Sequence, residues 1–445
     1  MGRRVLVYGW AITGEAVAKA LLARGDEAVA ADDRVTEAGR ASAEAMGVTL
    51  VDKPEGAALD ALVRGCDLLA PSPGIPEHHP VIAAARAGGL PVVSELDLAY
   101  EWEQARPGGP RPMLGITGTD GKTTTTLLAE AMVEASGRRA VSCGNTEVPL
   151  VSALDLPVDV FVVECTSFRL AWAESFRPEA ATWLNLASDH LDWHLSPSTY
   201  GSAKARIWEH QRSTDAAIAF ADDAAVMARL SSAPARHLTF AAAAADYRNE
   251  GGVLTGPTGA IAEVAVMRRS LPHDITNALA AAATVLEAGV SSVDAVATAL
   301  AAFEGVAHRI SFVVEADGIS WYDDSKATTP HAALTAVRAF DSVVLIAGGR
   351  NKDLDLRSMA SEPGRMRGVV AIGEAAAAIE EAFVWACPVR TAASMDAAVA
   401  EARLLARPGD VVLLSPGCAS FDWYKGYAAR GDDFARAARA LVGQA

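Results

Sequence analysis

The stretch Gly115-Ile-Thr-Gly-Thr-Asp-Gly-Lys122-Thr123 decides the fold of the region around it. It fits the pattern G-x-x-x-x-G-K-[ST] of a phosphate-binding loop, lying between a predicted strand at residues 113–116 and a predicted helix. Its glycines let backbone N–H groups close around phosphate oxygens, and the helix presents its positive N-terminus to them. The pattern therefore predicts a nucleotide site, and a glycine-rich turn without a ligand is the less favoured alternative.

The rest of the chain repeats this strand–turn–helix arrangement. Short apolar runs alternate with Ala-rich helical stretches, which is typical of α/β domains with parallel sheets. Residues 104–112 are rich in Pro and Gly, and residues 305–309 follow the end of a helical pattern, so both look like junctions. We therefore expect a Rossmann-like domain at 1–102, a central phosphate-loop ATPase-like domain at 103–305 and a C-terminal Rossmann-like domain at 306–445.

Composition excludes several classes of protein. The formal net charge of −16 opposes nonspecific binding to nucleic acid or anionic membranes, because both are phosphate-rich. The five cysteines are widely separated and form no CxxC pair, so neither a disulfide framework nor a structural zinc site is indicated. There is no signal-peptide pattern, and no apolar run reaches the roughly 18 residues of a membrane span. We expect a cytoplasmic protein without nucleic-acid or membrane partners.

Candidate cation ligands follow the phosphate loop. Glu164 closes the apolar run 158–163, which places a carboxylate at the edge of the sheet where ligands bind. Residues 188–194, Ser-Asp-His-Leu-Asp-Trp-His, are dense in oxygen and nitrogen donors and lack a thiolate, which suits Mg²⁺ better than zinc. Lys204 lies shortly beyond them. For any of these residues alone, helix capping or surface polarity is the simpler interpretation.

Two further regions carry site signals. The turn Gly9-Trp-Ala-Ile-Thr-Gly14, followed by Asp32 and Asp33, has the outline of a dinucleotide fingerprint; a nucleotide-sugar site and plain strand–helix packing explain it equally well. In the last third, polar segments at 322–330, 348–352 and 415–422 each follow a predicted strand. Parallel strands end at one edge of a sheet, so we expect these segments to gather there.

These motifs together resemble the Mur ligases, over the whole chain. The residues that carry the resemblance are Ser72-Pro-Gly-Ile75, Gly115 to Thr126, Gly144-Asn145, Glu164-Cys-Thr-Ser-Phe-Arg169, Asp189-His190-Leu-Asp192, Lys204, Asn277-Ala-Leu-Ala280, His308-Arg309, Asp324-Ser-Lys-Ala-Thr328 and Leu414-Ser-Pro-Gly-Cys-Ala-Ser420. The last two motifs and the N-terminal domain favour, within the family, an ATP-dependent ligase that adds D-glutamate to UDP-N-acetylmuramoyl-L-alanine through an acyl phosphate.

The resemblance implies roles for the central residues. It implies ATP and two Mg²⁺ as cofactors, and a Lys204 that is carbamylated and so becomes an anion. The catalytic residues that it implies are Lys122, Glu164, His190 and Lys204, and the metal ligands are Thr123, Glu164, His190 and carbamylated Lys204. The ATP-binding positions that it implies are Gly115, Thr117, Gly118, Thr119, Asp120, Gly121, Lys122, Thr123, Thr124, Asn277, Arg309 and Asp324.

The resemblance also implies where the two small-molecule substrates bind, in a protein that we expect to be a monomer. The UDP positions are Ile12, Thr13, Asp33, Arg34, Ser72 and Gly74, with Asn145 near the muramoyl-alanine end. The glutamate positions are Lys326, Thr328, Lys352, Ser420, Phe421 and Tyr427.

The chain departs from the family pattern at a few positions. Asp120 replaces a frequent Asn, Glu147 a Gly, Tyr427 a Phe, and Pro272 and Asp274 a Gly and an Asn. These changes affect details of the ATP, muramoyl and glutamate contacts rather than the class of reaction.

Competing interpretations explain less of the chain. Folylpolyglutamate synthase lacks a comparable N-terminal domain, which residues 9–34 and 72–75 indicate here. A nicotinamide dehydrogenase leaves the phosphate loop unexplained. Another Mur ligase and a non-catalytic ATP-binding module stay open.

Overall fold

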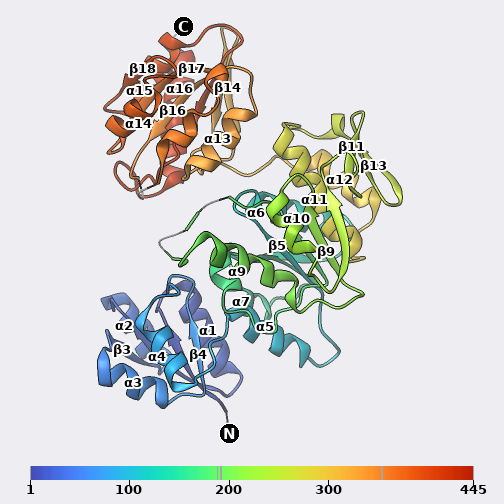
Figure 1. Ribbon diagram of the computed structural model, residues 1–445, viewed down its shortest axis with the longest axis vertical. Helices are drawn as coiled ribbons and strands as arrows, with labels where there is room; N and C mark the ends of the chain where they lie inside the picture. Colours follow the sequence, from blue (N-terminus) through green and yellow to red (C-terminus); the bar gives the residue numbers. More distant parts are fainter. Residues whose placement is uncertain (1, 188, 191–192, 352–353, 444–445) are drawn as a thin grey trace. The chain divides into compact units, whose positions relative to one another are not determined.

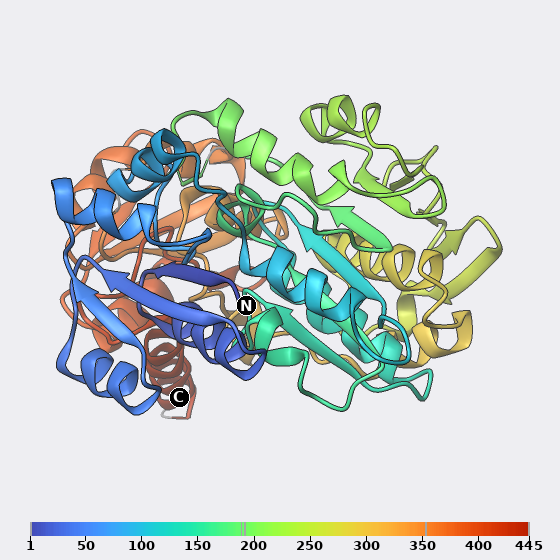
Figure 2. The ribbon, with the colours of Figure 1, turned by 90° about the horizontal axis from the view of Figure 1, so that it is seen from below.

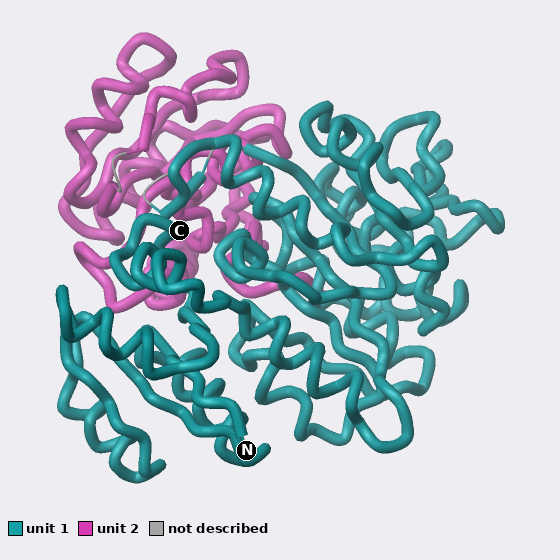
Figure 3. Tube along the Cα trace, turned by 60° about the horizontal axis from the view of Figure 1, so that its bottom comes forward, with its two compact units in different colours: residues 1–303 teal, residues 304–445 magenta. Residues whose placement is uncertain are grey.

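The structure, a computed structural model, describes residues 2–187, 189–190, 193–351 and 354–443 (Figure 1). The chain divides into two compact units, residues 1–303 and 304–445 (Figure 3). Parallel sheets with intervening helices occur in both units, which confirms the expected α/β class. The domain boundaries expected after residues 102 and 305 stay predictions. None of the described helices is long and apolar enough to cross a membrane.

The first sheet of unit 1 is parallel, with strand order β3-β2-β1-β4. Its elements are β1 (Arg4–Tyr8), α1 (Ile12–Ala23), β2 (Glu27–Asp32), α2 (Glu37–Ala45), β3 (Thr49–Asp52), α3 (Gly56–Arg64), β4 (Leu68–Pro71), α4 (Pro80–Gly88) and α5 (Glu95–Gln104). Because β1 lies between β2 and β4, the segments that follow these three strands meet at one edge of the sheet.

The second sheet of unit 1 has the order β10-β9-β8-β5-β7-β6 and is parallel throughout. Its elements are β5 (Met113–Thr117), α6 (Lys122–Glu134), β6 (Ala140–Gly144), α7 (Leu150–Ala153), β7 (Val160–Glu164), α8 (Ser167–Leu170), β8 (Ala180–Trp183), α9 (Pro197–Glu209), β9 (Ala216–Phe220), α10 (Ala224–Leu230) and β10 (Arg236–Phe240). A three-stranded antiparallel sheet and two helices complete the unit: β11 (Arg248–Glu250), β12 (Val253–Gly256), β13 (Gly259–Glu263), α11 (Pro272–Glu287) and α12 (Val293–Ala302).

Helices cover both faces of this second sheet (Figure 2). Alternate side chains of a strand point to opposite faces. Accordingly, Phe161 and Val163 of β7 join one hydrophobic core, while Val160 and Val162 join the other. The first core also contains Val5 of β1, so it continues into the N-terminal sheet and holds unit 1 together. With both faces buried, β5 and β7 are continuous apolar runs, as the sequence predicts for parallel strands.

Unit 2 is built on a sheet of order β14-β15-β19-β16-β17-β18, in which only the β14–β15 pair is antiparallel. Its elements are β14 (Ser311–Ala316), β15 (Ile319–Asp323), α13 (Pro330–Arg338), β16 (Val343–Gly348), β17 (Met366–Ile372), α14 (Ala376–Phe383), β18 (Val389–Thr391), α15 (Met395–Leu405), β19 (Val411–Leu414) and α16 (Tyr427–Val442). Strands β15, β19 and β16 are neighbours, so the three polar segments do follow adjacent parallel strands, as expected.

The core of unit 2 depends on Trp321. This side chain of β15 is completely buried, and its ring lies 6.2 Å from that of Phe434 on α16. We expect Trp321→Ala to lower the free energy of unfolding by about 3–5 kcal/mol, because it leaves a cavity in a packed core. Denaturant unfolding followed by circular dichroism measures this loss. The matched control is Trp385→Ala, since Trp385 is 63% exposed; equal losses in the two variants would contradict the assignment of the core.

Candidate functional site

The N-terminal turn brings two glycines and a serine into close contact. Gly9 has φ +97°, and a Cβ at Gly14 would lie only 2.1 Å from the carbonyl oxygen of Gly9. The hydroxyl of Ser72, which follows β4, donates to that same carbonyl at 2.6 Å. The helix α1 begins at Ile12, three residues after Gly9.

The two acidic residues after β2 have different partners. Asp32 accepts hydrogen bonds from the backbone N–H groups of Trp10 and Arg34, so it holds the turn. Asp33 accepts from the Tyr8 hydroxyl at 2.7 Å and pairs with His79 at 2.9 Å. Partial burial works against ionisation of Asp33, but these two hydrogen bonds outweigh it and lower its pKa. Of the remaining positions of the expected UDP site, Ile12, Arg34 and Gly74 are exposed and Thr13 is half-buried.

The phosphate loop joins β5 to α6 and is closely packed. Gly121, directly before α6, has φ +82°, and a Cβ there would lie 2.8 Å from Asn277 Oδ1 on α11. Thr125 of α6 also donates to Asn277 Oδ1, at 3.3 Å. The structure therefore places Asn277 against the phosphate loop, while its role in binding ATP stays a prediction. The first backbone N–H groups of α6 point out of its N-terminus, where an anion would be stabilised.

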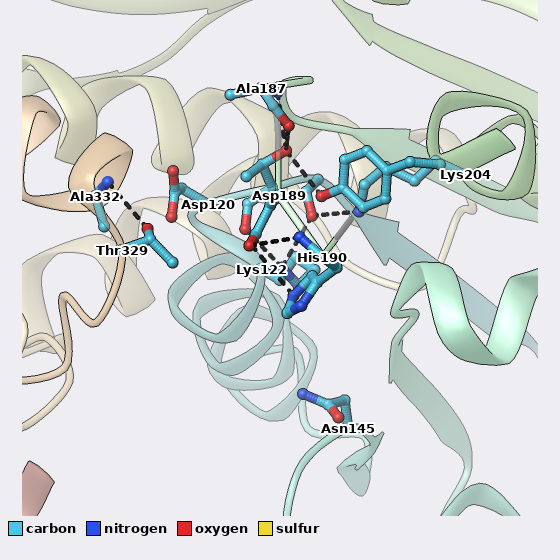
Figure 4. A network of polar contacts seen from close by, with 12 residues as sticks. Asp120, Lys122, Asn145, Ala187, Asp189, His190, Lys204, Thr329 and Ala332 are labelled. Carbon is cyan, nitrogen blue, oxygen red and sulfur yellow. Dashed lines mark hydrogen bonds and ion pairs between the residues drawn. The ribbon is translucent and has the colours of Figure 1, made fainter. Parts of the chain in front are cut away.

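Two lysines meet at one carbonyl group of the loop. The Gly118 oxygen accepts from Lys122 Nζ at 2.9 Å and from Lys204 Nζ, on α9, at 2.7 Å. Lys204 is only 1% exposed. Burial and the nearby charge of Lys122 hold the pKa of Lys204 well below the usual value for lysine, although the carboxylates of Asp189 and Asp120 act in the opposite direction. Figure 4 shows Lys122, Asp189, His190 and Lys204 close together beside the loop.

Glu164 lies at the carboxyl end of β7, beside β5, and is 1% exposed. Its Oε1 atom accepts from Asn145 Nδ2 at 3.0 Å, whereas its buried Oε2 atom has no hydrogen-bond partner among the described residues. A buried carboxylate oxygen is costly to leave unpaired, and oxygen donors of this kind are those that Mg²⁺ prefers. The Glu164 carboxylate therefore fits a cation.

His190 is another of the expected metal ligands. It has φ +53°, its Nε2 is 3.2 Å from Asp189 Oδ2, and its ring contacts those of Phe168 and Tyr200. Ser188 and Asp192 lie outside the described residues. Within the described parts of the chain, no three His, Cys, Asp or Glu side chains form a metal-binding cluster. The ligands implied by the resemblance include only two residues of these types, Glu164 and His190; the others are Thr123 and Lys204.

In unit 2, Asp324 follows β15 and is buried. It accepts from the Ser415 hydroxyl at 2.6 Å and from the backbone N–H of Ile310 at 3.2 Å. Burial raises the pKa of Asp324 to about 7, although the hydrogen bond from Ser415 and the charge of Arg309 act in the opposite direction. Arg309 and Asp324, both expected at the ATP site, therefore lie close to each other.

A buried arginine bonds to residues that neighbour some of the expected glutamate positions in sequence. Arg430 of α16 donates to the Ser325 hydroxyl at 2.9 Å and to the Cys418 carbonyl at 3.1 Å, so it joins the segments after β15 and β19. Lys326 lies over the ring of Tyr427, with Nζ 5.4 Å from its centroid. Of the other positions, Ser420 is buried, Thr328 is half-buried, Phe421 is exposed, and Lys352 lies outside the described residues.

Sequence reasoning missed three residues that shape these sites. Asn185 Oδ1 accepts from the backbone N–H groups of Thr119 and Asp120, both at 2.9 Å. These two N–H groups of the phosphate loop are therefore bonded to a side chain of the protein itself. The position of Asn185 just after β8 is a signal that could have found it. Tyr200, hydrogen-bonded to Thr119, and Arg430 lie on helices and had no comparable signal.

Comparison with known proteins gives the class. Residues 116–285 match the Mur ligase middle domain, and residues 308–418 match the Mur ligase, glutamate ligase domain. A solved MurF ligase from Thermotoga maritima, in complex with ADP, covers 100% of this chain and 95% of its own, with a TM-score of 0.60 and 17% identity; this likeness concerns the fold. The chain belongs to the Mur ligase family.

Several curated relatives, at 37–41% identity, carry the name UDP-N-acetylmuramoylalanine--D-glutamate ligase. The protein of that name from Frankia casuarinae is 41% identical to this chain, over 99% of this chain and 95% of the relative. The one from Mycolicibacterium vanbaalenii is 40% identical, over 99% of each. The similarity thus extends through the N-terminal region, which the two domain matches leave out.

The contact between Gly121 and Asn277 can be tested with a matched glycine. Gly121 and Gly137 have nearly equal φ angles, +82° and +83°, but a Cβ at Gly137 would meet nothing within 4 Å. Both Gly→Ala variants should lose about 1–2 kcal/mol of stability from the left-handed conformation. Only Gly121→Ala should also weaken ADP binding, by about tenfold or more, because a loss of about 1.4 kcal/mol of binding free energy lowers the affinity tenfold. Calorimetric titration with ADP measures this; equal affinities would contradict the expectation.

Proposed function

We propose that this chain joins D-glutamate to UDP-N-acetylmuramoyl-L-alanine, using ATP and an acyl-phosphate intermediate. The observation that carries the proposal is the similarity of 37–41% identity over 99% of the chain to relatives named for this reaction. Solved MurC and MurF ligases share the fold at 16–18% identity. The residues gathered at the phosphate loop support the same chemistry.

The proposed reaction needs activation of a carboxylate, which is a poor electrophile. Transfer of the γ-phosphoryl group of ATP to this carboxylate provides a leaving group, and the amine of D-glutamate then displaces phosphate to form the amide. Catalysis of phosphoryl transfer consists mainly of positioning and charge stabilisation. Lys122 and the N-terminus of α6 supply positive charge and N–H donors beside the transferred group.

Two Mg²⁺ ions belong to the proposal, one with Thr123 and one with Glu164, His190 and Lys204. When bound, they would neutralise charge on the phosphoryl oxygens. The unpaired Oε2 atom of Glu164 supports the second site. Lys204 fits this site only as an anion. Burial favours its neutral amine, and a neutral amine is the form that can add CO₂ and give a carbamate.

The substrates are assigned to three surfaces. The turn with Ile12, Thr13 and Ser72, together with the exposed Asp33, Arg34 and Gly74, would hold the UDP group. The exposed Asn145 would contact the muramoyl-alanine end. The glutamate would bind at Lys326, Thr328, Lys352, Ser420, Phe421 and Tyr427. Since one chain carries all three surfaces, we propose a monomer, acting in the cytoplasm where ATP and nucleotide sugars occur.

The decisive test is phosphate release from ATP with UDP-N-acetylmuramoyl-L-alanine and a panel of amino acids. We expect turnover with D-glutamate and not with L-glutamate, L-alanine, L-lysine or diaminopimelate. Mass spectrometry of the product shows whether the amide forms. Selective turnover with another amino acid would overturn the substrate assignment, and ATP binding without turnover in any mixture would favour a non-catalytic module instead.

The carbamate at Lys204 makes the activity depend on CO₂. We expect the rate to fall in CO₂-depleted buffer and to recover with bicarbonate, because carbamate formation is reversible. Lys204→Met should lose at least about 100-fold in kcat, the order seen when one preorganised charge-stabilising group is removed, and should not respond to bicarbonate. The exposed Lys19 provides the control: Lys19→Met should keep both the rate and the response. A wild-type rate independent of CO₂ would refute the carbamate.

A further inference from the structure

Arg169 is a buried cation with no part in the mechanism above. It lies on α8, directly after β7, and is 6% exposed. Its guanidinium donates to Glu95 from Nε at 3.0 Å, to Asn145 from Nη1 at 3.0 Å and to Thr13 from Nη2 at 3.3 Å. These partners belong to α5, to the segment after β6 and to α1. One side chain therefore links the N-terminal turn with the residues beside Glu164.

Glu95 holds this arginine in place. It is 3% exposed at the start of α5, and its second oxygen accepts from the backbone N–H of Val151. A buried ion pair is tolerated only when its geometry and remaining hydrogen bonds are good. Here the carboxylate neutralises the guanidinium from one side, so the two Nη atoms keep a defined direction toward Asn145 and Thr13.

The contacts of Asn145 determine which way its amide points. A guanidinium can only donate and an ionised carboxylate can only accept. Asn145 lies between the two, with Oδ1 accepting from Arg169 and Nδ2 donating to Glu164 Oε1 at 3.0 Å. The reverse orientation would set the amide oxygen against the carboxylate and the NH₂ group against the guanidinium. Arg169 therefore excludes the flipped amide.

This chain of contacts also orients Glu164. Its Oε1 atom is occupied by Asn145, and its Oε2 atom is the oxygen left without a hydrogen-bond partner among the described residues. If the amide could rotate, the carboxylate would lose the donor that defines its orientation. Residues that orient a metal ligand contribute strongly to metal affinity although they do not touch the metal.

We infer that Arg169, neutralised by Glu95, is a positioning residue that fixes Asn145 and, through it, turns the Glu164 carboxylate toward a divalent cation. The inference depends on the proposed function in one respect only, namely that the cation belongs to the active site of a ligase. Because the same guanidinium contacts Thr13, the orientation of Glu164 is also tied to the turn assigned to the UDP group.

The test measures cation binding rather than turnover, with Mn²⁺ alone as the probe and the electron paramagnetic resonance signal of unbound Mn²⁺ as the readout. Arg169→Met keeps the length of the side chain and removes every donor. We expect it to weaken Mn²⁺ binding about tenfold or more, as for other residues that orient metal ligands. Wild-type protein that binds no Mn²⁺, or an Arg169→Met variant that binds it as tightly as the wild type, overturns the inference.

Arg111→Met is the matched control for the loss of a buried ion pair. Arg111 pairs with Glu103 at 2.7 Å, with side chains 10% and 2% exposed. Its guanidinium also donates to the backbone carbonyls of Leu154, Leu156 and Val158. We expect this variant to lose stability and to keep Mn²⁺ affinity. Equal weakening in both variants overturns the inference, because general destabilisation would then explain the effect.

Two double variants distinguish loss of positioning by Arg169 from the effect of leaving the buried Glu95 carboxylate without its partner. Glu95→Gln with Arg169→Met removes both charges, so Mn²⁺ affinity that returned to the wild-type value would overturn the inference. In the second, Asn145→Ala is combined with Arg169→Met. If Arg169 acts through Asn145, the double variant binds Mn²⁺ no more weakly than Asn145→Ala alone, whereas additive losses contradict this. None of these titrations uses D-glutamate, so they can succeed even if the proposed reaction fails.

Discussion

The Gly118 carbonyl group holds together the lysines beside the phosphate loop. It accepts hydrogen bonds from both Lys122 and Lys204, which brings two ammonium groups to one oxygen in a region where Lys204 is almost completely buried. Two like charges at such a place are unfavourable, because there is little water to screen them. The Asp120 and Asp189 carboxylates oppose the resulting fall in the pKa of Lys204 but do not reverse it. A site of this kind favours the neutral form of the Lys204 amine.

The two buried arginines, Arg169 and Arg430, have different kinds of hydrogen-bond partner. Arg169 is paired with a carboxylate of similar burial, Glu95, and spends its other donors on Asn145 and Thr13. Arg430 in unit 2 donates instead to neutral groups, the Ser325 hydroxyl and backbone carbonyls, and burial lowers its pKa to about 10. Arginine suits both places because its planar group keeps several donors in fixed directions. In each unit, one arginine joins segments that are distant in sequence.

The sequence predicted positions correctly for residues that directly follow parallel strands, because the carboxyl ends of these strands lie at one edge of the sheet. Glu164 was expected at the edge of the sheet because it closes an apolar strand, and it lies there beside β5. The polar segments of unit 2 follow neighbouring strands for the same reason. Asn185 also follows a strand, β8, which ends at Trp183, but it was missed because a single Asn after a strand has no motif around it. Tyr200 and Arg430 lie on helices, where no such rule applies.

The sequence by itself determined the α/β class, the phosphate loop and the family, because each depends on local patterns or on similarity along the chain. Tertiary structure alone decided which oxygen of Glu164 lacks a hydrogen-bond partner, how the Asn145 amide points and why the pKa of Lys204 is lowered. These properties arise from groups as far apart in sequence as Thr13, Glu95 and Arg169. Hydrogen-bond direction and desolvation act over a few ångströms in space, and only the folded chain brings those groups together.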